Sequence, residues 1–373
     1  MEFMSDRRRI CFVGNCQTVH LKRWVDYFKD KSNVYVLSSR PCNHKECLLF
    51  DNIIPARWRK FVSFPKIGFV LRSTFLYKYL RANKIDLVHI HQLGGFESRI
   101  GKSLIFLRFQ PLVVTTWGKD VVGLRDDRQR VLRSYVLQKA DLVTAVSNFL
   151  AKETRKIAPG IKRLEVVPFG VDLDIFDPKR FKRKEESKKI LRIGFFKHLK
   201  PKYGPEYLLR AFKIVSEKFN NAELFLAGKG ELKEELEGLA EELGLSRKVH
   251  FLGFVENVPE VMASMDVTAM PSVEDSETFG VAAAESQALE IPVVASRVGG
   301  VPEVLVDGKT GFLVPPKDYK ALAGAMIKLL SDVNLRKEMG KSGRKFVESK
   351  YNWKDNAGEM SALYDDVLGK ADV

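Results

Sequence analysis

Residues 271–316 read PSVEDSETFGVAAAESQALEIPVVASRVGGVPEVLVDGKTGFLVPP. The alanine-rich run after Gly280 favours a helix, and the short apolar segments at 293–295 and 311–314 favour buried strands. Helices alternating with short apolar strands predict a parallel sheet that is covered by helices, which is an α/β fold. Such folds bind ligands at the carboxyl ends of their strands, where loops lead into helix N-termini.

Two glutamates lie close to the start of the predicted helix. Glu277 falls in the loop before it and Glu285 about a turn and a half into it, so both side chains can face one crevice. A carboxylate there can accept two hydrogen bonds from a vicinal diol, such as that of a ribose. In the alternative interpretation, Glu277 complements the positive end of the helix dipole and Glu285 is a solvated helix residue.

Taken together, the motifs of this segment resemble the nucleotide-sugar-binding signature of the retaining glycosyltransferases of family 4. The matching parts are, in order, Pro271-Ser272, Glu277 with Phe279-Gly280, Glu285, Pro292 to Ser296, Gly299-Gly300, Pro302-Glu303, and Gly308 with Thr310-Gly311. The resemblance implies the B-type (GT-B) fold, in which two Rossmann-like βαβ domains face each other across a cleft. In that fold a C-terminal helix crosses back to the first domain.

The same resemblance implies the domain boundaries. Residues 1–178 form an N-terminal, acceptor-side domain, on which a C-terminal helix at 354–373 packs. The charged run at 179–189 is a linker, and residues 190–353 form the nucleotide-sugar-binding domain.

The resemblance also assigns a donor site to the second domain. Lys197 follows a predicted strand at 191–196 and Lys202 comes five residues later, which is the spacing that the family uses to hold a donor diphosphate. With Glu277 on the sugar hydroxyls, these three are the implied catalytic residues, and Glu285 is implied to bind the ribose. Further donor contacts are implied for Phe279, Gly280, Val281, Val255 and Gly14. The alternative is that both lysines are ordinary exposed residues of a lysine-rich protein.

On the acceptor side, the segment from Asp86 to His91 resembles the family's Asp-x-x-His-x-His strand. His89 is expected to be buried in that strand, whereas His91 lies nearer its end and the cleft. Trp117 stands where the family commonly has a histidine, and an indole cannot replace both hydrogen-bonding functions of an imidazole. Asp120 matches the family pattern but can equally cap the following turn.

The composition fits a soluble protein of about two domains, with 373 residues of which 45% are hydrophobic. The sequence contains no apolar run of the roughly 20 residues that span a membrane, and its start lacks the features of a signal peptide. The four cysteines all fall within the first 47 residues, and reduced thiols are expected rather than a disulfide framework. We expect no metal site. The expected location is cytoplasmic, with a peripheral position on the inner face of the cell membrane left open.

Positive charge is concentrated in the first half of the chain. Residues 1–180 hold 33 Lys and Arg against 17 Asp and Glu, whereas residues 181–373 hold 29 against 30. A polyanionic partner, an anionic membrane or an acidic substrate would each explain this asymmetry. Basic and aromatic residues interleave from Trp58 to Arg81, where an amphipathic helix is predicted from Lys66 onward. That helix either packs on the sheet or docks on a membrane.

The sequence therefore predicts a retaining, metal-independent glycosyltransferase of the hexosyltransferase type. Its partners would be a nucleotide sugar, UDP- or GDP-linked, a glycan or lipid-linked acceptor in cell-surface polysaccharide or glycoconjugate synthesis, and an anionic membrane surface. We expect no resident cofactor and no nucleic acid. A nucleotide-sugar epimerase of similar fold is one alternative. A non-catalytic basic module that binds membrane or nucleic acid is another, although the intact pairs of glutamates and lysines argue against it.

Overall fold

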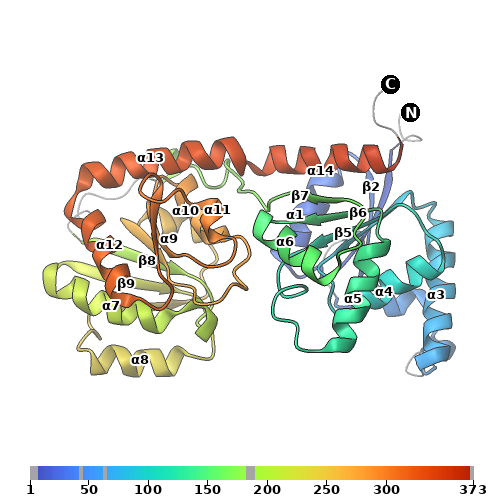
Figure 1. Cartoon of the computed structure of the whole chain (residues 1–373), viewed down its shortest axis with the longest axis horizontal. Helices are drawn as coiled ribbons and strands as arrows, with labels where there is room; N and C mark the ends of the chain where they lie inside the picture. The colour runs from blue at the N-terminus through green and yellow to red at the C-terminus, as the bar shows by residue number, and fades with distance from the viewer. Residues whose placement is uncertain (1–6, 42–44, 62–64, 182–189, 370–373) are drawn as a thin grey trace. The chain divides into compact units, whose positions relative to one another are not determined.

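The computed structural model describes residues 7–41, 45–61, 65–181 and 190–369. The chain divides into two compact units, Met1–Val167 with Ala357–Val373, and Pro168–Asn356. Each unit is built on its own parallel sheet with helices on both faces (Figure 1). Of the linker predicted at 179–189, residues 182–189 lie outside the described residues.

The first unit contains a seven-stranded sheet in the order β3-β2-β1-β4-β5-β6-β7. Its strands are β1 (Arg9–Val13), β2 (Asn33–Ser38), β3 (Cys47–Leu49), β4 (Leu87–His91), β5 (Leu112–Thr116), β6 (Leu142–Ala145) and β7 (Leu164–Val166). Its helices are α1 (Val19–Phe28), α2 (Ala56–Arg59), α3 (Pro65–Ala82), α4 (Gly95–Phe106), α5 (Asp127–Lys139) and α6 (Asn148–Ile157), with a 3₁₀ turn at Phe50–Ile53. The central strands are buried throughout, as helices on both faces of a parallel sheet require.

The second unit contains a six-stranded sheet in the order β10-β9-β8-β11-β12-β13. Its strands are β8 (Leu191–Phe196), β9 (Ala222–Ala227), β10 (Val249–Gly253), β11 (Val267–Met270), β12 (Val293–Ser296) and β13 (Gly311–Val314). Its helices are α7 (Pro205–Lys218), α8 (Lys233–Glu242), α9 (Val258–Ala263), α10 (Val281–Ala288), α11 (Val301–Val304), α12 (Tyr319–Ser331) and α13 (Val333–Lys350), with 3₁₀ turns at Pro178–Arg180 and Pro201–Tyr203. Helices α7, α8 and α12 cover one face, and α9, α10 and α13 cover the other (Figure 1).

Both sheets have a switch point, where the strand order reverses. It lies between β1 and β4 in the first unit and between β8 and β11 in the second. In open α/β sheets ligands bind at the carboxyl ends of these two strands. The segments that leave them therefore define where a site is expected: Gly14 and the end of β4 in one unit, Lys197 and the segment from Pro271 in the other.

The last helix, α14 (Trp353–Val367), joins the first unit from Ala357 onward. Arg8 forms an ion pair with Asp365 on this helix, with 2.8 Å between Nη1 and Oδ1. Tyr364 is buried, and its hydroxyl lies 2.5 Å from His89 Nδ1, while His89 Nε2 lies 2.6 Å from Thr115 Oγ1. These contacts confirm that the C-terminal helix returns to the first domain, and they place His89 in the core as expected.

The helix predicted from Lys66 onward is confirmed as α3. The helix does not have one apolar and one polar side, as an amphipathic helix would, because apolar residues lie on both its buried and its exposed side. Leu76 and Leu80 are buried in the core of the first unit, whereas Ile67, Val70 and Tyr77 are 52%, 56% and 43% exposed. Val70 follows Ile67 by three residues and Tyr77 follows Val70 by seven, so the three exposed side chains lie along one side of the helix.

The expectation of reduced cysteines is wrong for Cys16, which is disulfide-bonded. Folding gathers this part of the chain, because β3 pairs with β2 and Cys16 lies in the loop after β1. The Cys47 sulfur consequently lies 3.2 Å from the Cys16 sulfur, which is a contact and not a covalent bond, since Cys47 is not disulfide-bonded. Cys11 is buried within β1 as a free thiol.

Candidate active site

The switch point of the second unit holds a buried ion pair. Lys197 follows β8 and Glu277 lies in the loop after β11, with 2.8 Å between Nζ and Oε2. The two side chains are only 16% and 10% exposed. Burial alone would lower the pKa of Lys197, but the charge and hydrogen bond of Glu277, followed by the charges of Tyr203 and Glu285, outweigh it and raise the pKa. Lys197 is therefore a fixed cation at neutral pH.

Tyr203 brings the two predicted diphosphate ligands together. The Lys197 and Lys202 ammonium groups lie 5.2 Å and 4.5 Å from the centroid of its ring. The negative face of an aromatic ring attracts cations at such distances, so Tyr203 supports both without neutralising either. Sequence analysis did not single out this residue, although an aromatic side chain directly after Lys202 was a visible signal.

Two glycines position the backbone that carries Glu277. A β-carbon on Gly300 would lie 1.9 Å from the carbonyl oxygen of Thr278, and one on Gly299 would lie 2.2 Å from that of Glu277. The Gly300 N–H also donates to the Glu277 carbonyl at 3.0 Å. Asp275, which sequence analysis missed, accepts a hydrogen bond from the Gly299 N–H at 2.9 Å. Only glycine permits this close approach of two loops.

Neighbouring loops pack in the same way. Gly204, with a φ of 63°, begins α7, and a β-carbon there would lie 2.2 Å from the Pro271 carbonyl oxygen. A β-carbon on Gly228, directly after β9, would lie 2.0 Å from the Lys197 carbonyl oxygen. The loops that follow β8, β9 and β11 are thus in direct backbone contact. These contacts fix the backbone positions of the two lysines and of Glu277.

The start of α10 lies directly after Glu277. Gly280 caps the helix in a left-handed conformation, with a φ of 95°. The first N–H groups of a helix have no acceptor within it, so those from Gly280 onward are oriented to bind an anion. Phe279 contributes only its backbone here, because its side chain is 2% exposed and packs edge-on against Phe169 and Tyr351.

The remaining predicted donor residues of this unit lie around the same edge of the sheet. Glu285 is half-buried on α10, one helical turn and more beyond Val281. Val255 is half-buried in the loop after β10, beside Phe254, which is 70% exposed. The Lys229 ammonium lies 5.9 Å from the Phe254 ring.

In the first unit, Gly14 and His91 meet at the switch point. A β-carbon on Gly14 would lie 3.2 Å from the His91 carbonyl oxygen. His91 is 1% exposed. Its ring is tilted against that of His89, with 3.9 Å between the ring centroids, and its centroid lies 5.8 Å from that of Trp117. Burial, followed by the charge of His20, lowers the pKa of His91 to about 3, so the ring is neutral. Within the described part of the chain, neither of its nitrogens has a hydrogen-bond partner.

Asp120 caps a turn. Its buried carboxylate accepts hydrogen bonds from the backbone N–H groups of Gly118 at 2.7 Å, Trp117 at 3.0 Å and Leu93 at 3.1 Å. These donors precede Asp120 in the chain and do not belong to the turn that follows it, so a role of Asp120 in the site stays a prediction. Trp117 itself is half-buried, and the centroid of its ring lies 5.5 Å from that of His20.

Comparison with known proteins identifies the family. Residues 176–346 match the sequence model of glycosyl transferases group 1, and residues 9–147 match that of the glycosyl transferase 4-like proteins. An N-acetyl-alpha-D-glucosaminyl L-malate synthase of Bacillus anthracis is 30% identical over 82% of this chain and 81% of its own length. The chain belongs to the group 1 glycosyltransferases.

Two further matches extend over most of this glycosyltransferase. An uncharacterized glycosyltransferase of Methanocaldococcus jannaschii is 34% identical over 90% of the chain and 86% of its own length. The crystal structure of the Anabaena protein HepE in complex with UDP has a TM-score of 0.78 at 17% identity, covering 96% of this chain and all of that one. The expected α/β fold of two Rossmann-like domains is confirmed.

The described residues of this glycosyltransferase contain no group of three or more His, Cys, Asp or Glu side chains placed to hold a metal ion. Across the same residues, no helix combines the length and the apolar character needed to cross a bilayer.

Proposed function

We propose that this glycosyltransferase transfers a sugar from a nucleotide diphosphate sugar to an acceptor hydroxyl with retention of configuration, and without a metal ion. The buried Lys197–Glu277 pair at the switch point carries this proposal. The Lys202 ammonium, which lies over the same Tyr203 ring as Lys197, adds a second positive charge for a diphosphate. The N–H groups at the start of α10 add further hydrogen-bond donors. UDP in the HepE complex supports testing UDP sugars first, with GDP sugars as the alternative.

The proposed reaction uses these residues as follows. The bond between the anomeric carbon and the diphosphate oxygen breaks, and a bond to the acceptor oxygen forms on the same face of the sugar. The leaving diphosphate takes the acceptor proton, while Lys197, Lys202 and the α10 N–H groups stabilise its charge. Lys197 pairs with Glu277. A bound diphosphate would share that lysine and leave Glu277 able to accept hydrogen bonds from the sugar hydroxyls, with Glu285 holding the ribose.

The first test is a titration of UDP, GDP and ADP, followed by turnover with the matching sugars in the presence and absence of an acceptor. We expect one nucleotide to bind and its sugar to be consumed only when an acceptor hydroxyl is supplied. EDTA should leave the rate unchanged. Consumption without acceptor to give an isomeric nucleotide sugar would favour an epimerase, and loss of activity with EDTA would refute the metal-free mechanism.

Lys202→Ala tests the diphosphate contact. Because a charge-assisted hydrogen bond is worth about 1.5–3 kcal/mol, we expect the affinity for the nucleoside diphosphate to fall roughly tenfold or more. The affinity for the bare nucleoside should stay within about twofold, and both can be measured by isothermal titration calorimetry. Lys213→Ala is a matched control, since Lys213 lies on α7 and pairs with Glu217 on the same helix. Equal losses for nucleoside and diphosphate would contradict the contact.

We further propose that the first unit docks on an anionic membrane to reach a lipid-linked acceptor. The exposed residues Ile67, Val70 and Tyr77 form an apolar stripe along α3, and Lys66 and Lys78 are exposed beside it. Basic residues near an anionic bilayer contribute about 1 kcal/mol each, and the apolar side chains can insert shallowly. The excess of positive charge in the first half of the chain also favours binding to an anionic membrane.

Val70→Glu tests this docking, because Val70 is 56% exposed and its replacement leaves the core intact. We expect the variant to remain in the supernatant when wild-type protein co-sediments with vesicles that contain phosphatidylglycerol at low salt. Val131→Glu is the matched control, a 70% exposed valine on α5 that should sediment like the wild type. Failure of the wild type to sediment would refute the docking while leaving the donor site unaffected.

A further inference from the structure

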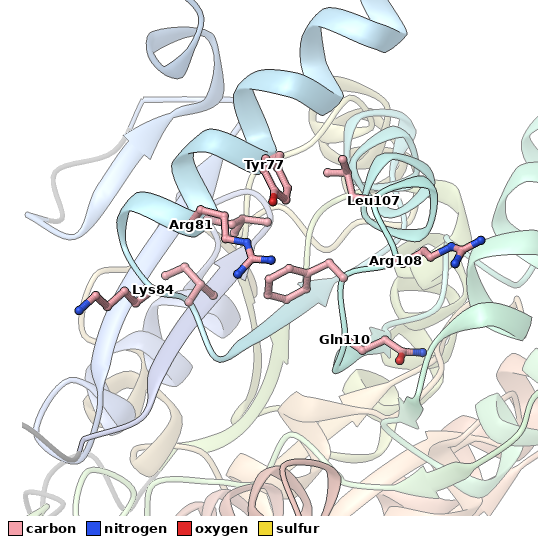
Figure 2. A pocket seen from close by; sticks show the side chains of 9 residues that line it. Tyr77, Arg81, Lys84, Leu107, Arg108 and Gln110 are labelled. Atoms are coloured by element: carbon pink, nitrogen blue, oxygen red, sulfur yellow. The ribbon is translucent and has the colours of Figure 1, made fainter.

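A pocket of ≈ 380 Å³ lies in the first unit, between the end of α3 and the end of α4 (Figure 2). Ile85 and Gln110 in its lining lead into β4 and β5, so it lies at the edge of the sheet where these strands begin. Gly14 and His91 lie at the opposite edge, where the strands end. The pocket is therefore separate from the switch point of this unit.

The pocket combines an apolar floor with a cationic rim. The floor consists of Leu80, Ile85, Leu107 and Phe109, and the rim carries Arg81, Lys84 and Arg108. Figure 2 shows the Arg81 guanidinium pointing into the space between the helices, whereas the charged ends of Lys84 and Arg108 point outward on opposite sides of the opening. The described residues that line the pocket include no acidic side chain.

The three rim cations have no carboxylate partner among the residues that the structure describes. The nearby carboxylates are directed elsewhere. Asp86 accepts a hydrogen bond from the Arg9 N–H at 2.7 Å, and Asp141 accepts hydrogen bonds from Leu112 at 2.8 Å and from the Gln110 amide at 3.2 Å. The pocket thus retains a net positive charge that no side chain lining it offsets.

The backbone places two of these cations in the same unusual way. Helix α3 ends with hydrogen bonds from Lys84 N–H to the Arg81 carbonyl and from Ile85 N–H to the Leu80 carbonyl. Helix α4 ends identically, with Arg108 bonded to Ile105 and Phe109 to Leu104. This is the Schellman motif, whose left-handed position is usually glycine. Here Lys84, with a φ of 49°, and Arg108, with a φ of 52°, take that position.

A cation near a helix C-terminus also complements the helix dipole, and this is the simplest structural explanation. It accounts for a basic residue anywhere in the last turn, and α3 already has Arg81 there. It does not account for basic residues at the one position where a β-carbon is strained, in two helices whose ends meet at a single pocket.

From these observations we propose that the pocket binds a phosphomonoester whose organic group is apolar or aromatic. The planar fork of Arg81 matches two phosphate oxygens, and two further cations suit the nearly dianionic charge of a phosphomonoester at pH 7. Exposed side chains change rotamer within nanoseconds, so Lys84 and Arg108 can close on the anion from both sides. The apolar floor receives the organic group, and the volume fits one small ligand. Both a soluble metabolite and the head group of a lipid such as phosphatidic acid present this chemistry.

The decisive variant is Lys84→Gly with Arg108→Gly. Glycine relieves the left-handed strain, so the thermal midpoint should stay level or rise while both cations are lost. We expect the affinity for phenyl phosphate, measured by calorimetry at low salt, to fall at least tenfold, and binding of the donor nucleotide to stay unchanged. Lys317→Gly is the matched control, because it removes an exposed lysine with a φ of 66° from the other unit and should leave phenyl phosphate binding as in the wild type.

Vesicles distinguish the two sources of the phosphomonoester. If the ligand is a lipid, the wild type should prefer phosphatidic acid vesicles to phosphatidylglycerol vesicles, and the double glycine variant should lose that preference. If it is a soluble metabolite, phenyl phosphate should bind and the two kinds of vesicle should be equal. The proposal is refuted if the wild type binds neither phenyl phosphate nor phosphatidic acid selectively, or if the double variant binds as well as the wild type.

Discussion

Glu277→Gln should reduce turnover by two orders of magnitude or more while the protein remains folded. The amide has the shape of the carboxylate but not its charge, so it cannot balance Lys197 at 2.8 Å or accept strong hydrogen bonds from the donor sugar. Loss of one preorganised polar group in a dry active site typically lowers the rate about 10²–10³-fold. The measurement is kcat with the donor sugar that binds, together with the melting temperature.

The same substitution leaves Lys197 buried without its main counter-charge. Removal of one partner from a buried pair destabilises a protein by about 3–5 kcal/mol when both groups are fully buried. We expect a smaller loss here, because the pair is partly exposed and Glu285 also interacts with Lys197. Glu274→Gln in the same loop is the control: Glu274 is exposed, so both rate and stability should stay near wild type. A Glu277→Gln protein with wild-type turnover would remove this residue from the proposed mechanism.

Gly300→Ala should both destabilise the second unit and slow the reaction. Gly300 has a φ of −86°, which alanine adopts readily, so the effect comes from the added β-carbon alone. That carbon would lie 1.9 Å from the Thr278 carbonyl oxygen, and the loop that carries Glu277 would have to move. We expect about 1–3 kcal/mol lower stability. A displacement of about 1 Å at a reacting group can lower the rate about 10²-fold.

Urea unfolding and kcat measure the two effects of Gly300→Ala separately. Gly324→Ala on α12 is the matched control, because a β-carbon there meets nothing within 4 Å. Replacement of glycine by alanine within a helix raises stability by about 1 kcal/mol, and the rate should not change. If Gly300→Ala retains wild-type stability and rate, the loop contact does not position Glu277.

The strands were the most predictable part of the molecule. The central strands are buried on both faces, so each reads as a short apolar run between turn residues, as at β11 and β12. Strand β3 was not predicted; its three residues are half-buried at the edge of the sheet. The α3 helix was predicted, but not that Ile67 and Val70 face solvent while Leu76 and Leu80 face the core.

The sequence by itself determined the α/β class, the family and the loops that carry Lys197, Lys202 and Glu277. These depend on local periodicity and on motifs that are contiguous in the chain. Tertiary structure alone decided which polar groups meet: Lys197 with Glu277, both lysines with Tyr203, and Asp120 with its turn. It also brought the ends of α3 and α4 to one pocket. The physical reason is that such contacts depend on how strands far apart in the chain pair and on how loops pack, which local sequence does not encode.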